Sequence, residues 1–306
     1  MPTKSLKESL TEGLFLLDGA MGTQLLNSGI KGLLCIDYFN VEFPDVVLDV
    51  HKAYIQAGSN AVITNTFGAN SVALSRHKLS GSVERINKAG VKIAREAAAG
   101  HAYVLGDIGP CGDFLEPIGS LTADSLRRVF LEQAAALMDG GVDGFIIETM
   151  SAVEEIVLAI EAVKSVSGNL PVFASMAYDW SKKGFRTSMG ADVSTCVSAI
   201  IDEGVDVVGF NCGRIPVGEY EKLAAEYVAI VNALGDGKVA VFAEPNAGEP
   251  SLVADRMVYS MLPEDFAAEM EAVFLAGVRI IGGCCGTRPE HIKAIAQLLK
   301  NRKSYF

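Results

Sequence analysis

Three cysteines at the ends of two apolar runs are the residues best suited to do chemistry in this chain. Cys284 and Cys285 are adjacent, have glycines on both sides, and follow an apolar run that predicts a short buried strand. Neighbouring side chains in a regular strand point to opposite faces, but glycine adopts backbone angles that let the chain bend, so both sulfurs can turn toward one point. Cys212 follows a second apolar run, at 207–211, in the same way. Three converging thiolates suit a zinc ion with one coordination position left open.

This arrangement predicts chemistry at a sulfur atom. Thiolate-rich tetrahedral sites favour zinc, and coordination to zinc deprotonates an incoming thiol, whose free pKa is about 8.5. The resulting thiolate is a nucleophile at neutral pH, which indicates alkylation of a thiol rather than activation of water. The competing interpretation is that the cysteines are small buried hydrophobes. That role is common for a single cysteine, but three at two strand ends favour the metal.

Asp18 and Glu148 end two further apolar runs and are candidates for binding an amine. Asp18 opens the stretch 18–23, whose two glycines let backbone N–H groups approach a carboxylate. The alternative is an ordinary turn in which Asp18 caps a helix. An unpaired carboxylate is costly to bury at the position of Glu148, so this residue pairs either within the protein or with a ligand cation. An amine clamp, a set of backbone amides and a zinc thiol site together indicate a thiol-bearing amino acid as ligand.

Other polar residues near predicted strand ends are weaker candidates. Asn246 lies in a turn and is either a turn residue or a weak oxygen ligand or substrate contact. Asn65 and Thr66 either line the same cavity or satisfy loop backbone. Cys196 falls in a helical pattern and is expected in the core, whereas Cys111 follows a strand and is a weak candidate for the cavity mouth.

Eight apolar runs alternate with helical patterns and must position these residues. The runs are 14–17, 61–66, 103–107, 144–148, 172–176, 207–211, 239–243 and 279–282. Their spacing leaves room for a helix and two loops between strands, and glycine repeatedly follows a predicted helix. Helix starts with capping boxes are expected at Ser151 and Thr287. The pattern predicts an α/β fold, a single-domain (β/α)8 TIM barrel over residues 1–306, with 1–13 as an N-terminal extension; a doubly wound open sheet is the competing fold.

Barrel closure would place the first strand, which ends at Asp18, beside the last strand, which leads to Cys284 and Cys285. Enzymes of this architecture carry their chemistry at the carboxyl ends of the strands. The residues expected there are Asp18, Asn65, Asp107, Glu148, Asn211, Cys212, Asn246, Cys284 and Cys285. An open sheet would not require the first and last strands to be neighbours, so their pairing distinguishes the two folds.

The composition excludes several classes of partner. The 306 residues include 26 basic and 37 acidic ones, for a net charge of −11, which argues against binding nucleic acid or an anionic membrane. The first residues lack the apolar segment of a signal peptide, and no apolar run reaches the length of a membrane span. Six cysteines are too few for a disulfide scaffold in a chain of this length, so we expect reduced thiols and a cytoplasmic location.

Taken together, the motifs resemble the homocysteine S-methyltransferase family, and within it the N-terminal homocysteine-binding module of the cobalamin-dependent branch. The resemblance covers nearly the whole chain. The stretches that carry it include Asp18-Gly-Ala-Met-Gly-Thr23, Thr64-Asn-Thr-Phe67, Gly106-Asp-Ile-Gly-Pro110, Glu148-Thr149, Gly209-Phe-Asn-Cys212, Pro245-Asn-Ala-Gly248 and Gly282-Gly-Cys-Cys-Gly-Thr287.

The resemblance implies a zinc-dependent enzyme that binds homocysteine as a zinc thiolate and methylates it to methionine. It places zinc on Cys212, Cys284 and Cys285, and homocysteine on Asp18, Gly19, Ala20, Thr23, Glu148 and Asn246. It also implies methylcobalamin or another methylcorrinoid as methyl donor. Because the chain ends at Phe306, soon after the last predicted helix, we expect the corrinoid to arrive on a separate partner protein.

Two positions depart from the family pattern and keep other activities open. Ile63 stands where the family often has glutamate, and Glu244 stands where an apolar residue usually occurs. Both are expected near the mouth of the barrel. One alternative is the same zinc barrel with a small methyl donor, S-methylmethionine or betaine, or with demethylation of another methylated compound onto a corrinoid. The other is a module that binds zinc or a thiol amino acid without turnover. The sequence does not specify the oligomeric state.

Overall fold

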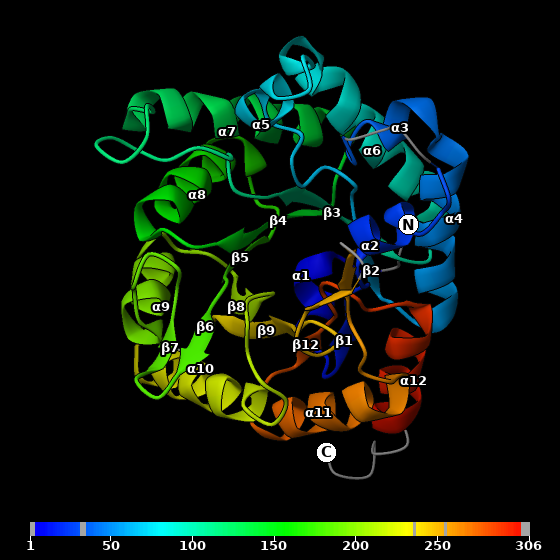
Figure 1. Ribbon diagram of the computed structural model, residues 1–306, viewed down its shortest axis with the longest axis vertical. Helices are drawn as coiled ribbons and strands as arrows, with labels where there is room; N and C mark the ends of the chain where they lie inside the picture. Colours follow the sequence, from blue (N-terminus) through cyan, green and yellow to red (C-terminus); the bar gives the residue numbers. More distant parts are fainter. Residues whose placement is uncertain (1–3, 31–34, 235–236, 254–255, 301–306) are drawn as a thin grey trace.

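The computed structural model describes residues 4–30, 35–234, 237–253 and 256–300, and its centre is one sheet of eight parallel strands (Figure 1). The strands, in the order in which they pair, are β1 (Phe15–Leu16), β12 (Ile280–Ile281), β9 (Ala240–Glu244), β8 (Val207–Asn211), β5 (Val172–Met176), β4 (Gly144–Met150), β3 (Tyr103–Ile108) and β2 (Ala61–Ile63). Each predicted apolar run overlaps one of them, and the sheet curls into a nearly closed (β/α)8 barrel, which confirms the predicted fold.

The first strand of the sheet along the chain, β1, and the last, β12, are neighbours, as closure of the barrel requires. Phe15 of β1 pairs with Ile280 of β12 in parallel register, so the open-sheet alternative is wrong. Between β1 and β2 the described residues form no strand ladder. Asn60 bridges this seam instead, because its side-chain Oδ1 accepts from Leu16 N at 2.8 Å and its own N–H donates to Leu16 O at 2.7 Å.

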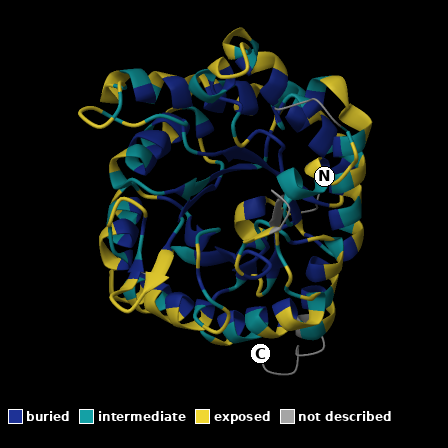
Figure 2. Cartoon of the chain, viewed as in Figure 1, coloured by how far each residue is buried: buried dark blue, intermediate teal, exposed yellow. Residues whose placement is uncertain are grey.

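Most of the helices surround the barrel and bury apolar residues against it, and exposed residues lie along their outer sides (Figure 2). The helices are α1 (Leu6–Ser9), α2 (Met21–Leu26), α3 (Phe39–Glu42), α4 (Pro44–Ala57), α5 (Ser71–Ser75), the 3₁₀ turn η1 (Ser80–Ser82), α6 (Val83–Ala98), α7 (Ala123–Gly140), α8 (Val153–Ser167), α9 (Val193–Asp202), α10 (Tyr220–Leu234), α11 (Pro263–Leu275) and α12 (Pro289–Lys300). Gly58 follows α4 in a left-handed conformation, as predicted for a helix end. None of the described helices is both long and apolar enough to cross a bilayer.

The two predicted capping boxes do not form. The N-cap of α8 is Ala152, which makes no side-chain capping bond. The Thr287 hydroxyl donates to Cys284 O at 2.7 Å and accepts from Ala20 N at 2.9 Å. The first prediction was wrong because the N-cap of α8 falls one residue after Ser151. The second was wrong because the spacing of a capping box does not show that tertiary partners compete for the Thr287 hydroxyl.

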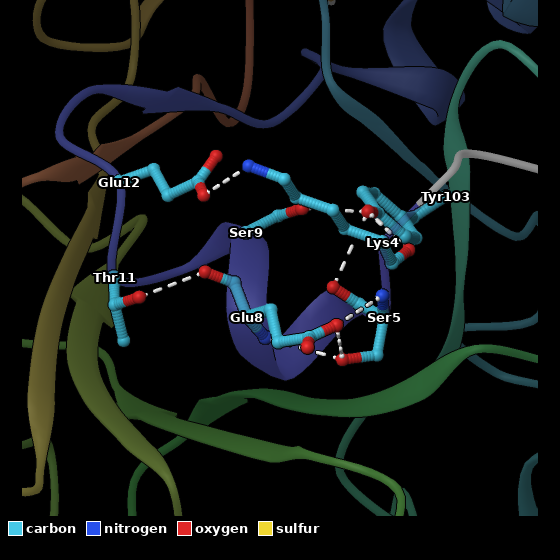
Figure 3. A network of polar contacts seen from close by, with 7 residues as sticks. All are labelled: Lys4, Ser5, Glu8, Ser9, Thr11, Glu12 and Tyr103. Carbon is cyan, nitrogen blue, oxygen red and sulfur yellow. Dashed lines mark hydrogen bonds and ion pairs between the residues drawn. The ribbon is translucent and has the colours of Figure 1, made fainter.

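Helix α1 closes the amino-terminal end of the barrel. Its Leu6, with Leu10 just after it, is buried in the cluster that fills the barrel interior, together with Phe15 and Tyr103. Polar contacts hold the segment in place (Figure 3): the Tyr103 hydroxyl lies 2.6 Å from Ser9 Oγ and donates to Lys4 O at 2.9 Å, and Ser5 caps the helix. With this end plugged, a ligand can enter the barrel only from the carboxyl ends of the strands.

Two hairpins that were not predicted project from the carboxyl-end side. They are β6 (Asp179–Ser181) with β7 (Gly184–Arg186), after β5, and β10 (Ser251–Val253) with β11 (Arg256–Val258), after β9. The first supports the loop that carries Cys212, because Arg214 N donates to Tyr178 O at 3.0 Å and Trp180 N donates to Arg214 O at 3.0 Å. The β6–β7 hairpin therefore supports the turn that holds Cys212.

Candidate active site

The three predicted zinc ligands form one cluster of sulfur atoms. Cys212 directly follows β8, and Cys284 and Cys285 follow β12. Strand β9 lies between these two strands in the sheet. The Sγ atom of Cys285 lies 4.0 Å from that of Cys212 and 4.0 Å from that of Cys284. All three sulfurs lie within 4.8 Å of one another, and all three residues are half-buried. Tetrahedral zinc with Zn–S bonds near 2.3 Å separates its sulfurs by about 3.8 Å, so this donor set fits zinc in both chemistry and spacing.

The turn that holds the paired cysteines is fixed by backbone contacts to neighbouring strands. Gly283 N donates to Asp18 O at 2.9 Å, and Cys284 N donates to Pro245 O at 2.8 Å. A Cβ on Gly283 would lie 2.5 Å from Thr287 Cγ2, so only glycine allows the chain this close. Cys212 itself has a φ of 55°, a left-handed conformation that is uncommon outside glycine. The sharp backbone turns expected from the glycines therefore bring all three sulfurs together.

Four carboxyl groups lie beneath this cluster, and we call them the acidic floor: Asp18, Asp107, Glu148 and Glu244. They come from the ends of β1, β3, β4 and β9 and line one cavity of about 460 Å³ with the three cysteines. Asp18 Oδ2 accepts from Ile63 N at 3.0 Å, which ties β1 to β2. Asp18 is therefore not a helix cap.

The charge of the acidic floor is not balanced by any basic side chain that the structure describes. Within the described part of the chain, none of its carboxyl groups forms an ion pair, and Asp18 Oδ1, Asp107 Oδ1 and Glu244 Oε2 are buried without a hydrogen-bond partner. Burial raises the pKa of Asp18, Asp107 and Glu244 well above the usual range, and the nearby charge of Glu148 adds to the effect. Burial also raises the pKa of Glu148 to about 7. Such a site favours a positively charged ligand group, which would restore the ionised form of these carboxyls.

The predicted backbone contacts at Gly19, Ala20 and Thr23 lie at the start of α2 and line the same cavity. Part of this set already has partners inside the protein: Ala20 N donates to Thr287 Oγ1, and Thr23 Oγ1 accepts from Gly286 N at 3.3 Å. The amides of the first turn of α2 that follow Ala20 lack an acceptor within the helix, and they are the groups available to a ligand carboxylate.

Of the weaker candidates, Asn65 lines the cavity, whereas Asn246, Cys111 and Cys196 are not among its described lining residues. Asn65 lines the cavity and also binds Ile36 O through its Nδ2 at 2.9 Å, so it does both things that were considered for it. Asn246 is buried, and its Nδ2 donates to Gly213 O at 2.9 Å. Its Oδ1 is buried and has no hydrogen-bond partner among the described residues. Cys196 and Cys111 are both fully buried, and Cys111 is likewise absent from the cavity lining.

The sequence reasoning missed three residues that shape the site. Asp107 and Asn211 were seen only as strand-end residues, and Glu244 was expected near the mouth, whereas it is 2% exposed at the cavity floor. Their position in the sequence could have indicated them, because each is the last or second-to-last residue of a parallel strand that is otherwise apolar.

The family model for homocysteine S-methyltransferase matches residues 15–299. The chain belongs to the homocysteine S-methyltransferase family. Relatives in this family include the methionine synthases of Mycobacterium tuberculosis, 31% identical over 318 residues, and of Mycobacterium leprae, 31% identical over 311 residues. These alignments cover 97% and 95% of this chain but 26% and 25% of the relatives, so the chain spans about a quarter of their length.

Solved structures of the homocysteine methyltransferase MmuM from Escherichia coli share the fold. The metallated form superimposes with a TM-score of 0.72 at 22% identity and covers 94% of this chain and 97% of that one. The oxidized form gives a TM-score of 0.76 at 22% identity, with coverage of 93% and 96%. The family barrel thus extends over nearly all of the chain.

Proposed function

We propose that this protein is a zinc-dependent methyltransferase that binds homocysteine and converts it to methionine with a methyl group from a methylcorrinoid. The observation that carries the proposal is the cluster of three cysteine sulfurs in one cavity with four carboxyl groups, three of them buried, that form no ion pair within the described residues. One half of the site suits a metal-bound thiol and the other suits an ammonium group. Homocysteine presents both groups on one short chain, together with a carboxylate.

In this proposal Cys212, Cys284 and Cys285 hold zinc. The S–S distances of 4.0 Å support this assignment because they need little adjustment to reach tetrahedral spacing. Zinc, when bound, would lower the pKa of the homocysteine thiol so that it is a thiolate at neutral pH. The three cysteines line the same cavity as the acidic floor, so a thiol bound in that cavity could reach a metal held by them.

The protein's own residues would orient the substrate. Asp18 and Glu148 bind the ammonium group, and the buried, unpartnered oxygens of Asp107 and Glu244 add negative potential behind them. Gly19, Ala20 and Thr23 would border the substrate carboxylate at the start of α2. Asn246 is bound to Gly213, next to Cys212, and its Oδ1, which has no partner among the described residues, would be available to the bound substrate. This binding energy fixes the direction of the sulfur before the methyl donor arrives.

The shape of the cavity supports a donor that approaches from outside. A corrinoid is too large to enter a cavity of about 460 Å³, so it would meet the thiolate at the mouth while held by a corrinoid protein. In this proposal residues 1–306 act as one homocysteine-binding barrel domain, with 1–13 as an N-terminal extension that contains α1. The six cysteines are all free, which is consistent with a reducing compartment, and we propose the cytoplasm.

A second candidate function uses a small donor in the same barrel. The cavity is larger than one homocysteine molecule requires, which leaves space for S-methylmethionine or betaine beside the thiol. A methyl-transfer assay with homocysteine and each donor in turn distinguishes the two. The corrinoid proposal requires methionine from methylcobalamin and none from the small donors, and its dependence on zinc is tested by Cys212→Ala, which should remove metal and activity together.

A further inference from the structure

Asn211, the last residue of β8, contacts both halves of the proposed site. It is 1% exposed. Its Nδ2 donates to the Glu148 carboxylate, to Thr149 Oγ1 at 2.7 Å and, more weakly, to Cys284 Sγ at 3.8 Å. A single buried amide therefore lies between a carboxylate of the acidic floor and a sulfur of the metal cluster.

The orientation of this amide follows from its other contacts. Asn211 Oδ1 accepts from Thr149 N at 2.8 Å and from Ser175 Oγ at 2.9 Å. A backbone N–H is always a donor, so the oxygen must face Thr149 N, and the NH₂ group must face Glu148 and Cys284. The oxygen accepts two hydrogen bonds and both N–H groups have acceptors, so the side chain is fixed at both of its polar ends.

We propose that Asn211 is a positioning residue that sets the amine-binding carboxylate and the metal-binding sulfur relative to one another. This inference rests on the proposed function, because it takes Glu148 as a contact of the substrate ammonium and Cys284 as a zinc ligand. Asn211 is not among the described residues that line the cavity. It acts through Glu148, whose Oε2 also accepts from Thr149 Oγ1 at 3.2 Å, and through the Cys284 sulfur.

Strained backbone on both sides of this amide supports the inference. Thr149 has a φ of 61° and Cys212 has a φ of 55°, and a left-handed conformation is especially unfavourable for a β-branched residue such as threonine. Thr149 N is held by Asn211 Oδ1, and Cys212 is the next residue along the chain. Strain of this kind persists only where surrounding contacts determine the conformation, and it commonly marks a functional site.

The chemistry of the amide explains why aspartate would not serve. Aspartate has nearly the same shape and keeps the acceptor that faces Thr149 N and Ser175. It replaces the donor toward Glu148 and Cys284 with a second acceptor, which repels the carboxylate and weakens support for the sulfur. Asn211→Asp therefore removes the proposed function of the side chain and changes its shape little.

The test compares two thiols that differ in the amino group. Homocysteine and 4-mercaptobutanoate, which lacks the amine, are titrated by calorimetry into zinc-loaded wild-type protein and Asn211→Asp, and zinc affinity is measured separately by competition with a chromophoric chelator. Ser175→Ala is the matched control, because it removes a contact to the oxygen side of the same amide and leaves the NH₂ side intact. Thr149→Val keeps the shape of the strained residue and removes its contact to Glu148, so it decides the question if Asn211→Asp does not fold.

We expect Asn211→Asp to weaken homocysteine binding by about tenfold or more and 4-mercaptobutanoate binding by much less, since only homocysteine uses the Glu148 clamp. Zinc affinity should fall by about 10- to 100-fold, as for other residues that support a metal ligand. Thr149→Val should also reduce the preference for homocysteine, and Ser175→Ala should leave both measurements within about twofold.

The inference would be overturned if Asn211→Asp weakened the binding of the two thiols equally, or if neither Asn211→Asp nor Thr149→Val changed the preference for homocysteine over 4-mercaptobutanoate. Either result would leave the proposed function in place. A wild-type protein that binds zinc but does not prefer homocysteine over 4-mercaptobutanoate would contradict the amine clamp itself, and with it both proposals. The wild-type titration thus separates failure of the positioning role from failure of the function.

Discussion

Replacing Glu148 with glutamine should strengthen the fold and weaken the binding of homocysteine. Burial raises the pKa of Glu148 from 4.5 to about 7. At 1.36 kcal/mol per pKa unit, ionising this group in the folded, metal-free protein costs at most about 3 kcal/mol. The figure is an upper bound because part of the side chain is exposed to the cavity. Glutamine avoids this cost, and its side-chain oxygen can still accept a hydrogen bond from Asn211.

The sign of the effect sets the pH at which it appears. The folded state keeps the proton of Glu148 to a higher pH than the unfolded state does, so the wild-type protein loses stability as the pH rises from about 4.5 to about 7. The variant has no such loss. Urea unfolding followed by circular dichroism in the presence of a chelator should show E148Q more stable than wild type at pH 8, by up to about 3 kcal/mol, and similar to it near pH 4.

Binding should change in the opposite direction. A hydrogen bond between a carboxylate and an ammonium group contributes roughly 1.5–3 kcal/mol, so the dissociation constant of homocysteine from the zinc-loaded variant should rise about 10- to 100-fold. Calorimetry at pH 8 measures this directly. An E148Q protein that is less stable than wild type at pH 8, or that binds homocysteine as tightly, would refute the reasoning that this partly buried carboxyl group is kept for a cationic ligand.

Other perturbations test separate parts of the structure. Homocysteine binding to wild type should weaken more steeply below pH 7 than binding to E148Q, because Glu148 takes up a proton in that range; parallel calorimetric pH profiles would contradict this. Cys212→Ser should weaken zinc binding by more than about 100-fold in a chelator competition, because it removes a ligand itself, and retention of one tightly bound zinc per chain would exclude Cys212 as a ligand. Gly283→Ala should displace Thr287, whose Cγ2 would lie 2.5 Å from the new methyl group, and should lower zinc affinity by about tenfold; unchanged affinity would show that the turn can relax. Leu6→Ala should cost about 2–5 kcal/mol in urea unfolding without changing zinc affinity, and a loss of zinc would mean that α1 acts on the site as well as on the fold.

The barrel and the sulfur cluster could be predicted because their signals are local. Each strand is a short apolar run between turn residues, and the glycines around Cys284 and Cys285 show where the backbone can bend. Parallel strands of a barrel present their carboxyl ends on one side, so the pairing of the first and last strands followed from closure alone. That pairing brings Asp18 close to Cys284, as expected.

The acidic floor and its support could not be predicted in the same way. Whether Glu244 is buried at the floor or exposed at the mouth depends on the twist of the barrel and on its neighbours, and no short stretch of sequence contains that information. The same holds for Asn211, whose partners come from β4, β5 and the loop after β12. The Thr287 hydroxyl shows the reverse case, in which a local signal for a helix cap was overridden by tertiary contacts to Ala20 and Cys284.

The most direct test of the proposed function is a methyl-transfer assay with homocysteine, carried out on protein of measured zinc content. Methylcobalamin, S-methylmethionine and betaine would be compared as donors, each with zinc-loaded and chelator-treated protein. The proposed function predicts one zinc per chain and methionine formed from methylcobalamin alone, only in the zinc-loaded sample. Methionine formed equally well after removal of zinc, or formed from a small donor in place of methylcobalamin, would contradict it.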